Sequence, residues 1–183
     1  MTSVAPEEDP DHGGGKQDRD EGQDIPGHWS RLGDTSQVAD FHVVAFVIVR
    51  DSAGRLLLAR RSGVSYGDGM WGLPGGHVEP DESLIAAAAR ETWEEVGIRV
   101  AHDDLSPIGL IRYADDDMSG LDVYFAAERF SGEPRPVSEC DAVGWYHSTE
   151  LPEESLPWLA GALQRVLVER TWFTDLVGTA PAE

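Results

Sequence analysis

The chain of 183 residues has one cysteine, one lysine and no long apolar run. Its single cysteine, Cys140, excludes an internal disulfide and is typical of a reducing compartment. No apolar run approaches the roughly 20 residues of a membrane-spanning helix. The first residues lack a basic region followed by an apolar stretch, so we expect no secretory signal. These absences together predict a cytoplasmic protein with no membrane partner.

Positive charge is scarce as well. Fourteen basic residues stand against 34 acidic ones, which gives a formal net charge of −20. A polyanion of this size repels DNA and RNA, so we expect no nucleic acid polymer as partner. A small phosphorylated substrate stays compatible with this charge, because divalent cations held by carboxylates create a local positive site.

The length predicts one domain with flexible ends. Residues 1–36 are rich in proline, glycine and acidic side chains, which is typical of a disordered acidic tail. Hydrophobic residues make up 40% of the chain, which is enough for a core, and we place the ordered domain at 37–173. Residues 174–183 are expected to be a flexible C-terminus.

Apolar periodicity and turn residues predict an alternation of strands and helices after the tail. Helices are expected at 83–96 and 155–170, and a Gly-rich loop at 62–70. Asp81 or Ser83 can cap the first helix, and Gly97 stands where a C-terminal glycine belongs. The strands are expected at 41–49, 55–60, 71–78, 108–113, 121–130 and 143–147.

The first helix carries three glutamates on or beside one face. Glu91 and Glu95 are four residues apart, and Glu94 borders the same face. Three carboxylates this close repel one another, and Arg90 can neutralise only part of that charge. The arrangement suits Mg²⁺ or Mn²⁺, which prefer oxygen ligands. Taken alone, the spacing fits a solvated glutamate-rich face equally well, and that is the commoner case.

The surrounding sequence favours the metal site. From Gly76 to Ile98 the chain reads GX5EX7REUXEEXGU, where U is apolar and Thr92 is a mild departure. This segment resembles the signature box of the Nudix hydrolases. The strands from Leu121 to Trp145 are similar to those of the MutT-like group within this family.

The resemblance implies an α+β fold. In this α/β/α sandwich a mixed β-sheet lies between helices, and the box forms a loop–helix–loop. It also implies hydrolysis of a diphosphate bond in a nucleoside diphosphate derivative, for the MutT-like group a nucleoside triphosphate cleaved to monophosphate and pyrophosphate. ADP-ribose or another nucleotide sugar or dinucleotide is an alternative substrate. A nucleotide-sensing module without catalysis is a further alternative.

The resemblance also implies individual functions within the box. Glu91, Glu94 and Glu95, with the backbone carbonyl of Gly75, are expected to bind Mg²⁺ or Mn²⁺. Arg90 is expected to orient these glutamates, and Glu82 to support the loop or to pair with Arg90.

The general base is expected among the glutamates, either in the box, at Glu91 or Glu94, or in the later loop. Glu139 follows a Gly-Glu-Pro turn and precedes Trp145, as in the MutT-like group. An ordinary surface glutamate is the alternative for Glu139. Asp141 is a second candidate for the base or for a contact with a nucleobase.

Substrate contacts are expected at the edge of the box. Gly76 and His77 follow the presumed phosphate-binding turn, and Arg60 or Arg61 ends the second strand near it. Phe46 and Tyr124 could line a base pocket, with core packing as the alternative. The sequence leaves open whether the protein is a monomer or a homodimer.

Overall fold

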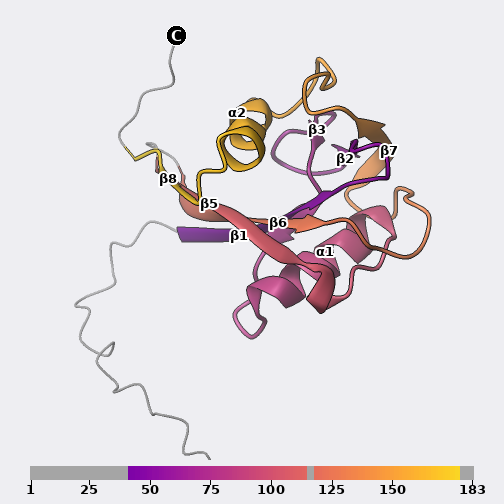
Figure 1. Ribbon diagram of the computed structural model, residues 1–183, viewed down its shortest axis with the longest axis horizontal. Helices are drawn as coiled ribbons and strands as arrows, with labels where there is room; N and C mark the ends of the chain where they lie inside the picture. The colour runs from indigo at the N-terminus through magenta and orange to yellow at the C-terminus, as the bar shows by residue number, and fades with distance from the viewer. Residues whose placement is uncertain (1–40, 115–117, 178–183) are drawn as a thin grey trace, which may run out of the picture. The chain divides into compact units, whose positions relative to one another are not determined.

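A computed structural model describes residues 41–114 and 118–177. The predicted tail, 1–36, and residues 115–117 lie outside these residues. The described chain forms two β-sheets and two main helical segments (Figure 1). No helix among these residues has both the length and the apolar character to cross a membrane.

The larger sheet contains both parallel and antiparallel neighbours. β1 runs parallel to β6, and β5 runs parallel to β8, whereas the pairs β4–β1 and β6–β5 are antiparallel. The predicted mixed sheet is therefore confirmed. Its strand order is β4 (Gly75–His77), β1 (Phe41–Val49), β6 (Ser119–Ala127), β5 (Ser106–Ala114) and β8 (Phe173–Asp175).

A smaller antiparallel sheet has the order β3 (Trp71–Gly72), β2 (Leu56–Arg61) and β7 (Cys140–Tyr146). Residues 71–78, predicted as one strand, thus contribute to both sheets. The strand is interrupted at Pro74, whose carbonyl accepts a hydrogen bond from the Val47 N–H at 2.9 Å. A proline donates no backbone hydrogen bond, so one regular ladder cannot run through it.

Helices cover both faces of the larger sheet (Figure 1). α1 (Leu84–Val96) packs Ala87 and Ala88 against one face, and α2 (Leu159–Leu163) packs Leu159 against the other. Side chains of β1 alternate between the two cores, as strand geometry requires. The predicted α/β/α arrangement is confirmed.

Local sequence explains both ends of α1. The Ser83 side chain accepts a hydrogen bond from the Ala86 N–H at 3.2 Å, so Ser83 rather than Asp81 is the N-cap. Gly97 ends the helix in the left-handed conformation at φ 71°, and its N–H donates to the Trp93 carbonyl. Both caps lie where the sequence predicts them.

The last helix differs from the prediction of 155–170. It begins at Leu159 and continues as a π-helical turn, η3 (Gln164–Val168). The preceding backbone is used elsewhere: Leu156 N–H donates to the Trp71 carbonyl at 2.9 Å, and Trp71 N–H donates to the Glu154 carbonyl at 2.8 Å. Because these bonds tie the segment to β3, the helix cannot begin at residue 155.

The C-terminal boundary at 173 is also too early. Thr174 and Asp175 belong to β8 and pair with β5, so the ordered domain includes part of the segment predicted to be flexible. Short strands at a sheet edge are weakly encoded in the local sequence.

Candidate active site

Two glycines bring the backbone of β4 against α1. Gly75 has φ 149°, and a Cβ atom there would overlap the carbonyl oxygen of Ala45. At Gly76 a Cβ atom would lie 2.5 Å from the Glu91 Oε1 atom. The turn therefore needs glycine at position 75, and glycine at position 76 leaves the Glu91 carboxylate directly beside bare backbone.

Glu95 is the buried carboxylate of the site. Only 7% of the residue is exposed, and its Oε2 accepts a hydrogen bond from the Gly75 N–H at 2.9 Å. Burial raises the pKa of Glu95 to about 8, and the nearby Glu91 charge acts in the same direction. The Gly75 hydrogen bond and the positive charge of Arg61 partly oppose this rise in pKa.

Glu91 is half-buried beside it. Burial is the largest cause that raises the pKa of Glu91, and hydrogen bonding to Arg90 lowers it in part. The charges of Glu94 and Glu139 raise it further. Two neighbouring carboxylates are therefore held where their charged forms are disfavoured.

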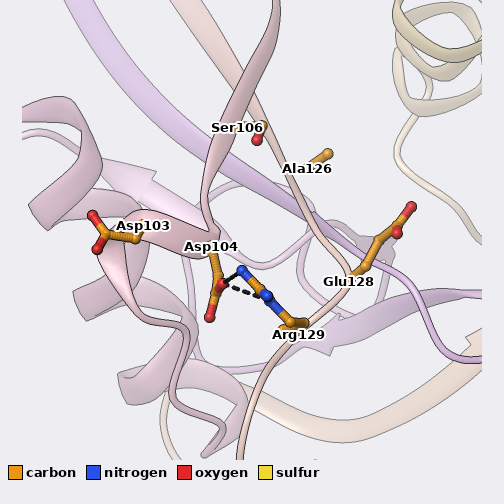
Figure 2. Close-up of a pocket in the computed structure, with 6 residues that line it drawn as sticks. All are labelled: Asp103, Asp104, Ser106, Ala126, Glu128 and Arg129. Carbon is orange, nitrogen blue, oxygen red and sulfur yellow. Dashed lines mark hydrogen bonds and ion pairs between the residues drawn. The ribbon is translucent and has the colours of Figure 1, made fainter.

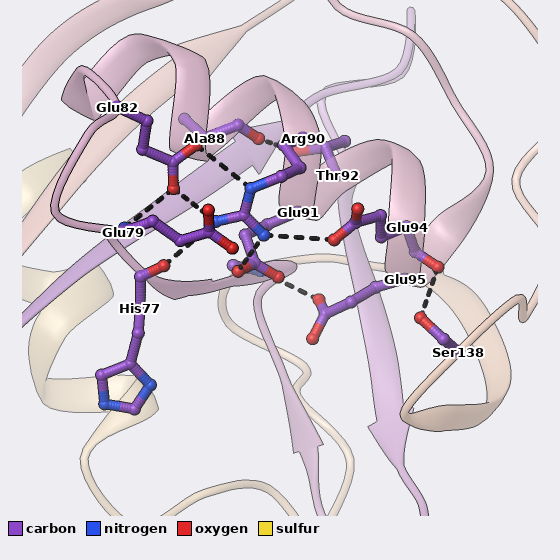
Figure 3. A network of polar contacts seen from close by, with 11 residues as sticks. His77, Glu79, Glu82, Ala88, Arg90, Glu91, Thr92, Glu94, Glu95 and Ser138 are labelled. Atoms are coloured by element: carbon purple, nitrogen blue, oxygen red, sulfur yellow. Dashed lines mark hydrogen bonds and ion pairs between the residues drawn. The ribbon is translucent and has the colours of Figure 1, made fainter.

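Arg90 connects the carboxylates of the box (Figure 3). Its Nη1 donates to Glu91 at 2.8 Å and to Glu94 at 3.1 Å, and its Nε donates to Glu82 at 3.1 Å. Nη2 donates to a second oxygen of Glu82 and to the carbonyl of His77. The predicted pairing of Glu82 with Arg90 is confirmed, and Arg90 holds the glutamates from one side.

The carboxylates suit a divalent cation. Glu91 and Glu95 offer oxygen ligands, and a nearby dication would relieve the burial and repulsion that raise both pKa values. Glu94 is more exposed and lies against Arg90. Within 41–114 and 118–177, no three carboxylate, imidazole or thiol side chains already lie within metal-binding range of one another. The complete ligand set therefore stays a prediction.

Glu139 lies next to this cluster although it is far away in the sequence. Ser138 Oγ donates to the Glu94 carbonyl at 2.7 Å, and Cys140 Sγ donates to the Glu95 carbonyl at 3.0 Å. Between them, Glu139 is exposed and has a positive φ of 53°, which is uncommon for a residue other than glycine. Such strain recurs at functional positions. Its charge raises the pKa values of Glu91 and Glu95.

Comparison with known proteins decides to which family the protein belongs. A family model described as the NUDIX domain matches residues 40–167. The chain belongs to the Nudix family. Proteins of this family are pyrophosphohydrolases that generally use divalent metal ions. The resemblance to the Nudix family that Gly76–Ile98 carries is thus confirmed.

Individual relatives agree with this assignment. A MutT-like protein of Streptomyces ambofaciens is 39% identical over 110 residues, which cover 60% of this chain and 66% of the relative. The CTP pyrophosphohydrolase of Escherichia coli strain K12 is 52% identical over 56 residues, which cover 31% of this chain and 40% of the relative. A MutT NUDIX hydrolase structure from Burkholderia pseudomallei has 30% identity and a TM-score of 0.62, and covers 69% of this chain and 98% of that one.

Two predicted substrate contacts lie outside the glutamate cluster. Arg60 forms two hydrogen bonds with Asp141, at 2.7 and 3.0 Å, which lower the pKa of the Asp141 carboxyl. Its neighbour Arg61 is the arginine whose charge acts on Glu95. His77 is exposed, and its ring nitrogen lies 3.1 Å from that of His42. The sequence of the Nudix box could not predict the contacts made by Ser138, Cys140 and His42. These contacts depend on how distant segments of the chain pack together.

A surface hollow elsewhere does not contribute to the Nudix site. Figure 2 shows its lining residues, which lie around the short helix η2 (His102–Asp104) and the adjoining ends of β5 and β6. Its one cation, Arg129, is paired with Asp104. A hollow lined by Asp103, Asp104 and Glu128 would repel a phosphorylated ligand, so the glutamate cluster is the better candidate.

Proposed function

We propose that this Nudix protein hydrolyses a diphosphate bond in a nucleoside triphosphate and releases the monophosphate and pyrophosphate. The observation that carries the proposal is the convergence of Glu91 and Glu95 on the Gly75–Gly76 turn. Buried carboxylates beside bare backbone form a site that a cation and a polyphosphate can enter together.

Each residue has a defined function in this proposal. Glu91, Glu94, Glu95 and the Gly75 carbonyl would hold Mg²⁺ or Mn²⁺, which when bound offsets the charge on the phosphate oxygens. Arg90 keeps the glutamates in position through its hydrogen bonds. Gly76 permits a phosphate to approach the backbone.

Glu139 is the proposed general base. Its carboxylate takes a proton from the attacking water, whose oxygen bonds to phosphorus as the bridging P–O bond breaks and the other phosphate leaves. The exposure of Glu139 gives water access to it, and its place between two residues that donate to the Glu94 and Glu95 carbonyls supports this assignment. Asp141 is a poorer base because Arg60 lowers its pKa.

The net charge of the chain and the names of its relatives support the proposed substrate class. The net charge of −20 favours a small substrate over a nucleic acid polymer. Two relatives are named as a MutT-like protein and a CTP pyrophosphohydrolase, which supports a nucleoside triphosphate.

A nucleotide panel tests the proposal. Purified protein with Mg²⁺ is assayed for phosphate release with and without inorganic pyrophosphatase, and a Glu95→Gln variant prepared in parallel controls for contaminants. A nucleoside triphosphate should give phosphate only when pyrophosphatase is present. Wild-type activity equal to that of Glu95→Gln on every nucleotide would refute hydrolysis.

A matched pair of variants tests the base. Glu139→Gln should lower kcat by about 10²- to 10⁴-fold with little change in KM. Asp141→Asn, which changes a carboxylate two residues away, should retain most of the activity. The opposite pattern would move the base to Asp141.

A further inference from the structure

A carboxylate without a function in the reaction lies across the sheet from the glutamate cluster. Asp122 of β6 is aligned with Val44 of β1, and Val44 is aligned with His77 of β4. Two strand spacings therefore separate Asp122 from β4, which is about 10 Å. Asp122 shares its side of the sheet with Tyr124, and this side faces α2. His77, Val44 and Asp122 thus form one row that starts at the phosphate-binding turn.

Asp122 is a half-buried acceptor with few partners. The Tyr124 hydroxyl donates to its Oδ2 at 3.3 Å, a long hydrogen bond. Within the described part of the chain, no arginine forms an ion pair with it. Burial raises its pKa to about 7. Arg165, whose charge acts on Tyr124, donates to the Gly161 carbonyl at 3.0 Å.

Burying the Asp122 carboxylate with so few hydrogen-bond partners costs free energy of folding, and this cost needs an explanation. A carboxylate in such surroundings destabilises the fold unless a ligand completes its hydrogen bonds. A buried structural aspartate would be expected to have a cation or several backbone N–H partners. A carboxylate that is partly accessible and lacks a cationic partner is suited to accept hydrogen bonds from a ligand.

Three aromatic side chains lie on the same side of the sheet as Asp122. The Phe46 ring is stacked on Tyr124 with 5.5 Å between centroids, and the Trp158 ring lies 5.1 Å from Phe46. Phe46 and Tyr124 are buried and pack in the core, whereas Trp158 and Asp122 are half-buried and reach solvent. A partly exposed Trp158 ring and a hydrogen-bond acceptor on the same side of the sheet match the two needs of a nucleobase, stacking and recognition of its edge.

We propose that Asp122 is a specificity residue that accepts hydrogen bonds from N–H groups of the substrate base. The inference rests on the proposed function, because the phosphates must lie at Gly75–Gly76 for the base to reach Asp122. Bases with an exocyclic amino group, such as cytosine and guanine, are then preferred over uracil, which has an oxo group in its place, and over hypoxanthine, which lacks the amino group of guanine. A hydrogen bond to a charged group corresponds to a preference of about ten- to hundredfold.

Nucleotides that differ in the exocyclic amino group of the base measure this preference directly. The ratio of kcat/KM for CTP over UTP and for GTP over ITP is determined for wild type, Asp122→Asn and Asp122→Val. At least one ratio should exceed about tenfold in wild type and fall to within about threefold in both variants. Asp103→Asn, at an exposed position in η2, is the matched control and should keep the wild-type ratio.

The possible outcomes separate the two proposals. Wild type without a preference in either pair, or Asp122 variants that melt cooperatively and keep the preference, would overturn the function of Asp122 alone. If wild type hydrolyses no nucleotide, the proposed function fails instead. Calorimetry with CMP against UMP and GMP against IMP then tests Asp122 without turnover, and equal binding of each pair would overturn it as well.

Discussion

At the scale of single residues, Arg90 determines where the glutamates of the box point. Its guanidinium contacts Glu82, Glu91 and Glu94 at once, and these contacts raise its own pKa further above the usual range. A planar fork with several N–H groups can do this, whereas a lysine presents a single point of charge. Positioning of the box therefore depends on the shape of this side chain as well as on its charge.

A conservative change at Arg90 should therefore be costly. Arg90→Lys is expected to lower kcat/KM by about ten- to hundredfold, because the glutamates lose their orientation. The measurement is steady-state hydrolysis of the preferred nucleotide at several Mg²⁺ concentrations. Arg99→Lys is the control, since Arg99 lies over the Trp93 ring, 4.0 Å from its centroid, and contacts none of these glutamates. Full activity of Arg90→Lys would show that a positive charge alone is enough to orient the glutamates.

The sequence could identify the glutamates but could not rank them. Helical spacing places Glu91, Glu94 and Glu95 together, yet Glu95 is buried and Glu94 is exposed. That difference arises because β4 packs on only one side of α1, which is a long-range contact. The position of Glu139 beside the cluster depends likewise on the docking of its loop onto the end of α1.

At the scale of elements, β4 and α1 together carry the proposed site. The two glycines of β4 should respond differently to alanine because different groups surround them. At Gly76 the obstacle is the movable Glu91 side chain, and at Gly75 it is the fixed backbone of β1.

Gly76→Ala should lose activity and keep most of its stability. Gly75→Ala should lose stability as well, because φ 149° is unfavourable for alanine and the Ala45 backbone cannot move away. Thermal melts and nucleotide hydrolysis are measured on both proteins. Equal destabilisation of the two variants would contradict this account.

The N-cap of α1 offers a prediction about stability alone. Ser83→Ala should reduce the free energy of unfolding by about 1 kcal/mol, because the Ala86 N–H loses its acceptor. Urea denaturation measures the change, with Ser65→Ala in the exposed loop as the control. Unchanged stability of Ser83→Ala would show that water replaces the cap.

Elements were predictable where local signals sufficed. Ser83 and Gly97 define α1, and the apolar run of β1 defines a buried strand. The start of α2 was not predictable, because a tertiary bond from Leu156 to Trp71 overrides local helix propensity. The split at Pro74 was missed because the two halves of one apolar segment pair with different sheets.

At the scale of the whole molecule, stability should depend on pH through buried carboxyls. Glu95 and Asp122 have pKa values of about 8 and about 7, above their ordinary values near 4. Both groups bind a proton more tightly in the folded state. Their contribution is therefore fully present below about pH 4 and is lost as the pH rises through 7 and 8. Carboxyls with lowered pKa values, such as Asp51, act only at more acidic pH.

In the presence of a chelator, the melting temperature should fall between pH 5 and pH 9, and Mg²⁺ should restore part of it at the alkaline end. The melting temperature of Glu95→Gln should fall less steeply with pH, because glutamine at position 95 cannot acquire a charge. Differential scanning calorimetry across this range measures both slopes. Parallel curves for wild type and Glu95→Gln would contradict burial of Glu95 as the cause.

The pairing of β1 with β6 also constrains how the protein is made. Residue 41 is aligned with residue 119, so β1 finds this neighbour only after most of the domain has left the ribosome. Until then β1 can pair with β4 alone, and one of its edges is exposed to other chains. Such distant pairing slows folding and favours aggregation during synthesis. The sheet that supports the Gly75–Gly76 turn is therefore completed late, and the nascent chain stays prone to aggregation until β6 has been synthesised.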